Sequence, residues 1–470
     1  MASRVDLRDV LEDEFYVLDL DGSLYYADEY EGGDEQFRAL VDKEVHSKSV
    51  ARERSPHIRY LSKLRLAESE PFSDAGHLSY LPNGALMLDL LKDYSTSVVL
   101  SIGANPVITS IMYDLEVSAI KKHAELFGQR MYKVKPGKRE FVLRYAACFG
   151  QFALLRRKYI TYRDLPLRIF ELADSYRYEQ RGELTGLTRV RRFFMPDMHV
   201  LTRDLDMAMD EFRFLYKKIF EEGRKFGFEY YSLYNVSVDF LTNHIDFLKT
   251  LLEIDGKPVL VRTVESGKYY WVLNVEFHYI DSLGRPLETA TVQIDVGNGE
   301  RFEIEYVDED GVKRNPVILH TAIHGSIERF LFEFLEEAAK MEKRGEKPRL
   351  PTWLSPTQVR VIPVNVTQHL EYSLKVADVL EENGIRVDID DRDYSLGRRI
   401  KDAESMWIPY ICVIGDAEVR DSTLSVRSRE GWNERLNVDQ LVDIINKELD
   451  GFPRRPLYTS RLISRRPSFI

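Results

Sequence analysis

The segment from Arg177 to His199 constrains the fold more than any other stretch of this 470-residue chain. Its 23 residues include five arginines, two glutamates and three aromatic residues, and Gly182 and Gly186 mark a turn near its middle. The pattern predicts a strand, a tight basic loop and a second strand, which together form a hairpin. Such a hairpin can place a phosphate-binding arginine and a carboxylate on one strand and an aromatic platform on the other.

The bulk composition predicts a soluble protein with about two or three domains. No stretch approaches the ~20 apolar residues of a membrane span, and the N-terminus lacks the apolar core of a secretory signal. Two cysteines cannot form a disulfide framework, so a cytoplasmic protein is expected. The net charge of −11 argues against indiscriminate coating of nucleic acid but allows a local basic groove for a specific RNA.

The order of patterns along the chain predicts three parts. Residues 1–55 form a short N-terminal arm with a β-hairpin at 15–30, and residues 56–348 form the large central domain. In residues 349–470, strands and helices alternate, which is typical of a compact α/β domain. The last stretch, 451–470, has five arginines and no acid, and it either contacts RNA or packs on the protein surface.

Within the central domain, three strand-like runs between residues 259 and 308 predict an antiparallel sheet. Residues 317–335 predict a strand, a Gly-Ser break and an amphipathic helix. Upstream, a helical pattern that begins near residue 83 precedes a strand with Pro106, which by itself reads as an edge-strand proline. The apolar run 141–150, which contains Cys148, reads as a strand.

Together these segments resemble the class II aminoacyl-tRNA synthetases, and in detail the threonyl family. The hairpin near 171–200 resembles motif 2, residues 317–335 resemble motif 3, and residues 84–110 resemble the motif 1 of the dimer interface. Residues 349–470 resemble the anticodon-binding domain of the threonyl, prolyl, histidyl and glycyl enzymes. The resemblance, over about residues 55–470, implies an α/β (α+β) fold, in which helices flank an antiparallel catalytic sheet and a C-terminal α/β domain follows.

The resemblance implies a homodimeric ligase that activates L-threonine with ATP and Mg²⁺ and transfers it to the 3′ end of tRNA(Thr). Both steps build negative charge that fixed cations stabilise. The implied site residues are Arg177 at the α-phosphate and carboxylate, Glu179 at the adenine amino group or tRNA end, Phe193 stacked on adenine, Arg329 at the γ-phosphate, Asp197 at the threonine ammonium and Gln293 in the pocket.

Cys148, His199 and His320 have no short ligand spacing, and each alone reads as a core cysteine or a satisfied histidine. The resemblance implies that they hold one active-site zinc per chain, with an open position for the amino and hydroxyl groups of threonine. Valine lacks the hydroxyl and should be rejected strongly. Serine lacks only a methyl group and should be excluded only ~10–200-fold.

Several positions depart from the bacterial pattern. Bacterial-type members carry glutamine where Met195 and Glu288 stand, and the string from Met195 to His199 resembles the archaeal type instead. A usual pocket tyrosine falls at Trp271, or at Tyr270 if the alignment slips by one residue.

In the C-terminal domain, Asp393, Glu418 and Arg427 match anticodon-reading positions. A carboxylate and an arginine suit splayed-out anticodon bases, although each could also be an ordinary surface charge. Only residues up to about 60 precede the catalytic-domain sequence, where the threonyl family commonly has an editing domain. We therefore expect that a separate protein, and not this chain, hydrolyses seryl-tRNA.

Two alternatives remain open at this point. A prolyl- or seryl-type ligase is disfavoured by the Cys148, His199 and His320 set, because prolyl and histidyl enzymes do not resemble this zinc arrangement. A non-catalytic tRNA-binding synthetase paralogue is disfavoured because such proteins commonly lose the arginines that stand here as Arg177 and Arg329.

Overall fold

The computed structural model describes residues 3–47 and 53–467, and the chain divides into two compact units. Two helices, α3 (Pro82–Ser101) and α10 (Ile327–Lys343), contribute turns to both units. The domain boundaries expected from the sequence stay predictions. Unit 1 consists of Met1–Glu53 and Ser95–Glu333, and unit 2 of Arg54–Tyr94 and Phe334–Ile470.

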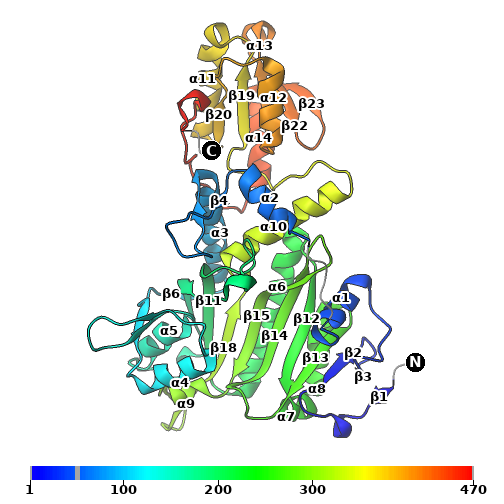
Figure 1. Ribbon diagram of the computed structural model, residues 1–470, viewed down its shortest axis with the longest axis vertical. Coiled ribbons are helices and arrows are strands. Elements are labelled where there is room, and N and C mark those ends of the chain that lie inside the picture. The colour runs from blue at the N-terminus through cyan, green and yellow to red at the C-terminus, as the bar shows by residue number, and fades with distance from the viewer. Residues whose placement is uncertain (1–2, 48–52, 468–470) are drawn as a thin grey trace. The chain divides into compact units, whose positions relative to one another are not determined.

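Unit 1 is built on an 11-stranded sheet with the order β1-β3-β2-β13-β12-β14-β15-β18-β11-β10-β6 (Figure 1). Neighbouring strands are antiparallel except in the pairs β12–β13 and β6–β10. The strands are β1 (Arg4–Val5), β2 (Phe15–Leu18), β3 (Leu24–Tyr26), β6 (Asn105–Pro106), β10 (Leu167–Tyr176), β11 (Arg192–Thr202), β12 (Tyr230–Ser237), β13 (Val259–Val264), β14 (Trp271–Ile280), β15 (Pro286–Asp295) and β18 (Val317–Ala322). The predicted hairpins, the antiparallel pair β14–β15 and the strand with Pro106 are therefore confirmed.

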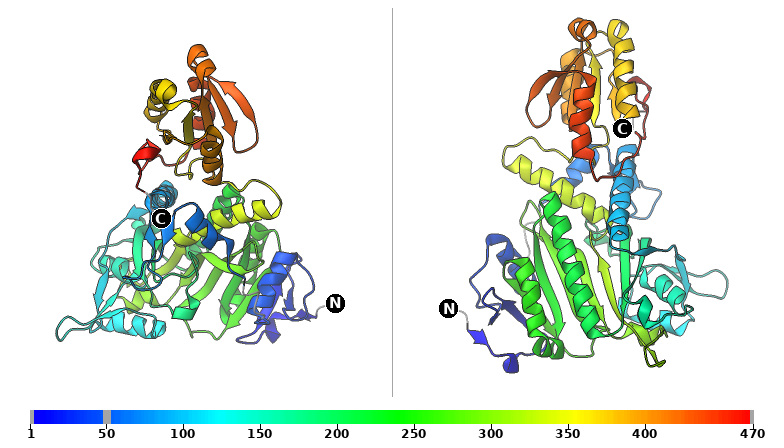
Figure 2. Two further views of the ribbon diagram at one scale, coloured as in Figure 1. Left: turned by 45° about the horizontal axis from the view of Figure 1, so that its top comes forward. Right: turned by 180° about the vertical axis from the view of Figure 1, so that it is seen from behind.

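One face of this sheet is covered by α6 (Leu205–Phe226) and α8 (Ile245–Asp255) (Figure 2). The side chain of Asp204 accepts a hydrogen bond from the Met207 amide at the start of α6, and Gly227 ends the helix in the left-handed conformation. Phe212 and Tyr216 lie on the buried stripe of α6. Every residue of β12 is buried, as expected for a strand covered on both faces.

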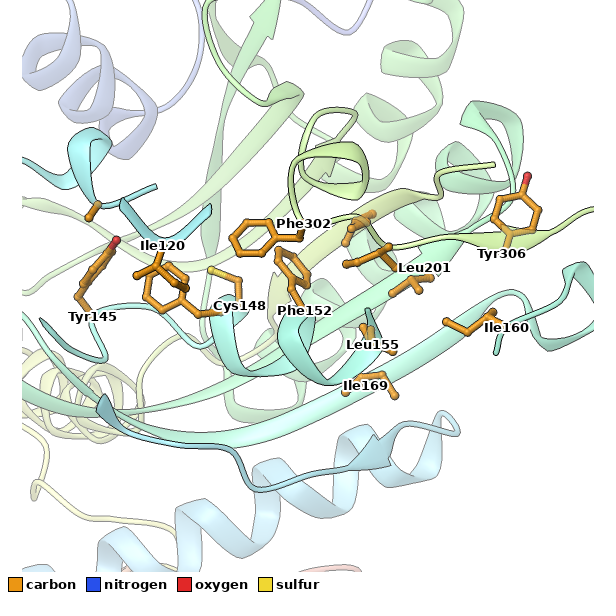
Figure 3. Close-up of a cluster of buried hydrophobic side chains, with 14 of the residues drawn as sticks. Ile120, Tyr145, Cys148, Phe152, Leu155, Ile160, Ile169, Leu201, Phe302 and Tyr306 are labelled. Carbon is orange, nitrogen blue, oxygen red and sulfur yellow. The ribbon is translucent and has the colours of Figure 1, made fainter. Parts of the chain in front are cut away.

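Besides the packing of α6 against the sheet, unit 1 contains a hydrophobic cluster beside β10 and β11 (Figure 3). Cys148 opens α5 (Cys148–Leu155), so the strand expected at 141–150 is wrong beyond the short β9. Phe149, Phe152 and Leu155 are buried at helical spacing, and this packing decides for a helix. The strand expected at 301–306 is also wrong: Glu303 has a left-handed backbone that interrupts the run.

The remaining elements of unit 1 are short. They are α1 (Glu35–Glu44), α4 (Ser118–Phe127), α7 (Val238–Asn243), α9 (Asn298–Arg301), β7 (Met112–Asp114), β8 (Lys133–Val134), β9 (Phe141–Leu143), β16 (Tyr306–Val307) and β17 (Lys313–Arg314). In the described parts of the chain, no helix is long and apolar enough to cross a membrane.

Unit 2 contains a five-stranded sheet with the order β20-β19-β21-β22-β23, parallel on the β20 side and antiparallel on the β23 side. The predicted alternation is confirmed, although α13 and β23 were not anticipated. The elements are α2 (Pro56–Lys63), β4 (Ala67–Glu68), β5 (Ser79–Tyr80), β19 (Val359–Pro363), α11 (Val366–Glu382), β20 (Val387–Ile389), α12 (Leu396–Ser405), β21 (Tyr410–Ile414), α13 (Asp416–Asp421), β22 (Leu424–Ser428), β23 (Asn433–Leu436) and α14 (Val438–Leu449).

The arginine-rich C-terminal tail, as far as it is described, packs on unit 2. Leu462 forms a parallel bridge with Ile389, and Arg461 pairs with Asp378 at 2.6 Å. The tail therefore packs on unit 2 through residue 467, and its contact with RNA stays a prediction.

Candidate active site

The register of the unit 1 sheet places those predicted site residues that lie in its strands on one face. Gln293 of β15 lies opposite His320 of β18, and His320 lies opposite His199 of β11. Opposed residues share a face, and residues two apart along a strand share it too. Phe193 and Asp197 therefore project from the same side of β11 as His199.

Arg177 directly follows β10 and is held by the backbone around it. Its Nε donates to the Tyr145 carbonyl oxygen at 3.1 Å, and its guanidinium carbon lies 5.1 Å from the centroid of the Phe193 ring. Burial lowers the pKa of Arg177, and the nearby charge of Arg329 lowers it further. Two arginines that repel each other in a buried setting are poised to bind a polyanion.

Arg329 is positioned by the break between β18 and α10. Gly325 has a left-handed backbone, and a side chain there would collide with the Thr289 carbonyl group. The Arg329 amide donates to Ser326 Oγ at 3.2 Å, which fixes the first turn of α10. Its Nη1 donates to the Glu288 carbonyl oxygen at 2.7 Å and lies 3.7 Å from that residue's carboxylate.

Glu179 sits at the base of the hairpin loop and is almost fully buried. Its carboxylate lies 3.7 Å from Arg130 and 3.9 Å from Arg189. Its carbonyl oxygen accepts hydrogen bonds from the Arg191 guanidinium at 2.9 and 2.6 Å. The basic loop is thus organised around this carboxylate rather than spread as a solvated face.

The pocket tyrosine that the sequence left open is Tyr270. Its hydroxyl donates to Gln293 Oε1 at 3.3 Å, and its ring centroid lies 5.7 Å from that of His320. Trp271 instead stacks on Tyr269, with centroids 4.6 Å apart. Tyr270 lies in the bend just before β14, whereas Trp271 is the first residue of that strand, and the two rings meet different partners.

Asp197 lies in a strongly desolvated position on β11. Burial raises the pKa of its carboxyl group to about 7, while the positive charges of His320 and Arg177 oppose this rise. A carboxylate in such a place gains most from a bound cation, because little water competes for it.

The two predicted histidine ligands face each other. His199 Nε2 lies 3.0 Å from His320 Nδ1, and the outer nitrogens contact Gln151 Oε1 at 2.8 Å and Asp295 Oδ2 at 2.6 Å respectively. Oxygen acceptors on the outer nitrogens are the usual supports of metal-binding imidazoles. Two imidazole nitrogens on one tetrahedral zinc lie roughly 3.3 Å apart, from Zn–N distances of ~2.05 Å, so this pair fits such an ion.

The third predicted ligand, Cys148, contacts a histidine that the sequence did not single out. Its Sγ lies 3.8 Å from His123 Nε2 in α4. Burial, aided by the charges of Asp197 and Asp295, raises the pKa of the thiol. Among the described residues, no three acidic, cysteine or histidine side chains stand close enough to hold a metal together. The zinc site expected at Cys148, His199 and His320 therefore stays a prediction.

His123 carried no signal in the sequence, because it lies 25 residues upstream of Cys148 on a separate helix. Burial, and then the charge of His320, lowers its pKa to about 4. Its ring centroid lies 6.3 Å from that of Tyr270, so it belongs to the same cluster of side chains.

The three predicted anticodon residues occupy different elements of unit 2. Glu418 in α13 accepts hydrogen bonds from the Gly415 amide at 2.9 Å and from Ser425 Oγ at 2.8 Å. Arg427 is an exposed residue of β22, and Asp393 is exposed just before α12. Within residues 3–47 and 53–467, no hydrogen bond or ion pair joins these three side chains.

Comparisons with known families agree with this architecture. The tRNA synthetase class II core domain family (G, H, P, S and T) matches residues 132–338, and the anticodon binding domain family matches residues 358–448. With its antiparallel sheet, Arg177 directly after β10 and Arg329 in α10, the chain is a class II aminoacyl-tRNA synthetase. The fold class expected from the sequence is confirmed.

Relatives that match over most of their length show to which family of class II synthetases the chain belongs. Threonine–tRNA ligases of Pyrobaculum arsenaticum and Pyrobaculum aerophilum are 48% and 50% identical to this chain, over 97% and 92% of it and 75% and 71% of their own lengths. The RNA binding domain of threonyl-tRNA synthetase from Cryptosporidium parvum has a TM-score of 0.75 at 26% identity, covering 85% of this chain and 99% of that one. The chain belongs to the threonine–tRNA ligase family.

Proposed function

We propose that this chain forms threonyl-adenylate from ATP and threonine and then transfers the threonyl group to tRNA(Thr). The observation that carries the proposal is the proximity of Arg177 and Arg329, whose charges act on each other and both act on the Glu288 carboxyl group. Two fixed cations match the charge that grows on the α-phosphate during attack and on the departing pyrophosphate. A non-catalytic paralogue would have no use for them.

The side chains divide the work of the first step. Arg177, held by the Tyr145 carbonyl, binds the threonine carboxylate and the α-phosphate, and Phe193 beneath it stacks on adenine. Arg329 binds the γ-phosphate, and Glu179 faces the adenine amino group or the tRNA end. Mg²⁺ that arrives with ATP neutralises further phosphate charge, and the Glu288 carboxylate beside Arg329 is suited to hold it.

Recognition of threonine involves its ammonium and hydroxyl groups. Asp197 accepts the ammonium, and Gln293, held by Tyr270, lines the pocket. We propose that Cys148, His199 and His320 hold about one zinc ion per chain. When bound, zinc supplies a Lewis-acid position that the amino and hydroxyl groups of threonine occupy together. Gln151 and Asp295 keep the two imidazole rings in place.

The decisive experiment is ATP–pyrophosphate exchange measured separately with each of the twenty amino acids. Threonine should support exchange, serine should do so ~10–200-fold less well, and valine should fail. Arg177→Ala should abolish the exchange, whereas Arg181→Ala, a change in the exposed part of the same loop, should retain it. If none of the twenty amino acids supported exchange, the proposal would be ruled out. Unimpaired exchange in Arg177→Ala would rule it out too.

We also propose that the active form is a homodimer joined near β6. This strand ends the 11-stranded sheet, and Leu100, Ile108, Ile111 and Met112 around it expose large apolar side chains. Ile108 is 98% exposed, which is costly unless another surface covers it.

Anticodon reading is proposed for the C-terminal domain, with Asp393, Glu418 and Arg427 as the contacting residues. Arg427 is the strongest candidate of the three for contact with an anticodon base, because this residue is exposed on β22. Glu418 already uses both carboxylate oxygens to hold α13, so its contribution would combine support with recognition.

We propose, finally, that this chain leaves seryl-tRNA intact for a separate editing protein. Among the described N-terminal elements, the strands β1, β2 and β3 extend the catalytic sheet, and α1 covers part of it. These elements therefore have a structural role in unit 1. The test is to isolate seryl-tRNA(Thr), add more of this protein and follow the ester bond. Stable ester is expected, and rapid hydrolysis by this chain alone would overturn the idea.

A further inference from the structure

A cavity of about 480 Å³ in unit 2 has a strongly basic lining. It lies within unit 2, among α12, β19, the turn after α2 and the docked C-terminal tail. Five arginines and a single carboxylate contribute to its walls. These are Arg65, Arg360, Arg392, Arg398, Arg466 and Asp402.

Three of the five arginines are neutralised by three carboxylates of the same unit. The pairs are Arg360–Asp388 at 2.8 Å, Arg466–Asp388 at 2.9 Å, Arg392–Asp390 at 2.6 Å and Arg392–Asp402 at 3.0 Å. Because Asp388 and Asp390 are fully buried, these ion pairs hold their arginines in place on the inner wall of the cavity. Three positive and three negative charges cancel there, and the pairs by themselves call for no ligand.

The other two arginines are different. Within the described ranges, neither Arg65 nor Arg398 has a carboxylate in ion-pair contact, and both side chains are exposed. Arg398 stacks on Tyr394, with its guanidinium carbon 3.8 Å from the ring centroid, which fixes its direction. Arg65 has a φ of 54°, a conformation that costs a non-glycine residue energy. The cavity therefore has an excess of two positive charges at its mouth.

We propose that this cavity binds a phosphate group. Two uncompensated guanidinium groups match the charge of one phosphate monoester or of two neighbouring phosphodiesters, whereas a single carboxylate would leave one of them unmatched. The volume falls within the range of small-ligand sites, roughly 300–1,000 Å³. The phosphate can come from the backbone of a bound RNA or from a free phosphorylated compound, because both present the same oxygens.

The test compares Arg65→Ala/Arg398→Ala with Arg435→Ala. The first variant removes the two unpaired cations, and since both are exposed and without carboxylate partners the fold should be unaffected. Arg435 is an exposed arginine of the same unit that pairs with Asp421 at 2.8 Å and does not line the cavity. It controls for the general loss of positive charge.

Two binding measurements, neither of which depends on catalysis, identify the source of the phosphate. The first is calorimetric titration with inorganic tripolyphosphate, with a stable threonyl-adenylate analogue present to fill the unit 1 site. The second is tRNA binding at several salt concentrations. Each phosphate contact that is lost should reduce the slope of log K against log salt by about 0.7–0.9.

If a free compound is the ligand, the double variant should bind tripolyphosphate at least tenfold more weakly, with tRNA affinity unchanged. If RNA is the ligand, tRNA binding should weaken and its salt slope should fall by about 1–2. Either result supports the site. Equal behaviour of the double variant and Arg435→Ala in both measurements would overturn it, whatever the aminoacylation activity of the protein.

Discussion

A buried ion pair beside the candidate active site offers a sharp test of how unit 1 is held together. Arg144 Nη1 and Glu171 Oε1 are 2.7 Å apart, and each side chain is only 3% exposed. Glu171 also accepts from the Thr109 amide at 2.9 Å and from its hydroxyl at 2.8 Å. The pair thus ties the loop after β6 to β10, at the position opposite Asp197 in the hairpin.

The expected magnitudes follow from this burial. Arg144→Met leaves the Glu171 carboxylate charged and unpaired, which should cost about 3–5 kcal/mol. In Arg144→Met/Glu171→Gln both charges are gone, and the glutamine oxygen can still accept from Thr109. The double variant should therefore lose less stability than Arg144→Met alone. The two sites should show a coupling of about 2 kcal/mol, within the usual range of 0.5–3 kcal/mol for contacting residues.

The assay is native-state hydrogen exchange, followed in peptides that cover β10 and β11. A loss of about 3–5 kcal/mol speeds exchange roughly a hundredfold to several-thousandfold, because about 1.4 kcal/mol corresponds to a factor of ten. The matched control is Arg156→Met, which breaks the Arg156–Glu303 pair, whose side chains are 55% and 69% exposed. That change should have less than about 1 kcal/mol of effect. Equal effects of the two single substitutions, or a double variant no better than Arg144→Met, would refute the reasoning.

Four further outcomes are expected. Cobalt-substituted protein should show a near-ultraviolet thiolate band that Cys148→Ser lacks; a wild-type spectrum without this band would remove the thiol from the metal site. Ile108→Asp should shift the sedimenting species from a dimer toward the 54.9 kDa chain, and an unchanged dimer would place the interface elsewhere. Arg427→Ala should slow charging of tRNA while adenylate formation continues, and equal loss in both steps would make Arg427 a structural residue. Burial raises the pKa of Asp255 from 3.8 to about 6, so its contribution to stability is full below pH 3.8 and is lost as the pH rises through about 6. The difference of about 2.2 pKa units corresponds to roughly 3 kcal/mol, and Asp255→Asn should flatten the profile of unfolding free energy between pH 4 and 6 by about that amount; an identical profile would contradict this.

The sequence by itself determined the elements whose signals are local. Hairpin β10–β11, the step from β18 into α10, and the strand–helix alternation of unit 2 all follow from periodicity and turn residues within about 30 residues of chain. The roles of Arg177 and Arg329 came instead from the resemblance of these segments to motifs 2 and 3 of the class II synthetases.

Only the tertiary structure decided features that depend on packing between distant segments. Cys148 begins a helix because Phe149 and Phe152 enter a cluster completed by residues far along the chain, such as Phe302. His123 reaches Cys148, and Gln151 and Asp295 reach the two histidines, through strand register and helix docking that no local pattern encodes. The choice of Tyr270 over Trp271 likewise rests on which ring meets Gln293 across the sheet. Local pattern fixes where a side chain stands on its own element, but its partners are set by how the elements pack together.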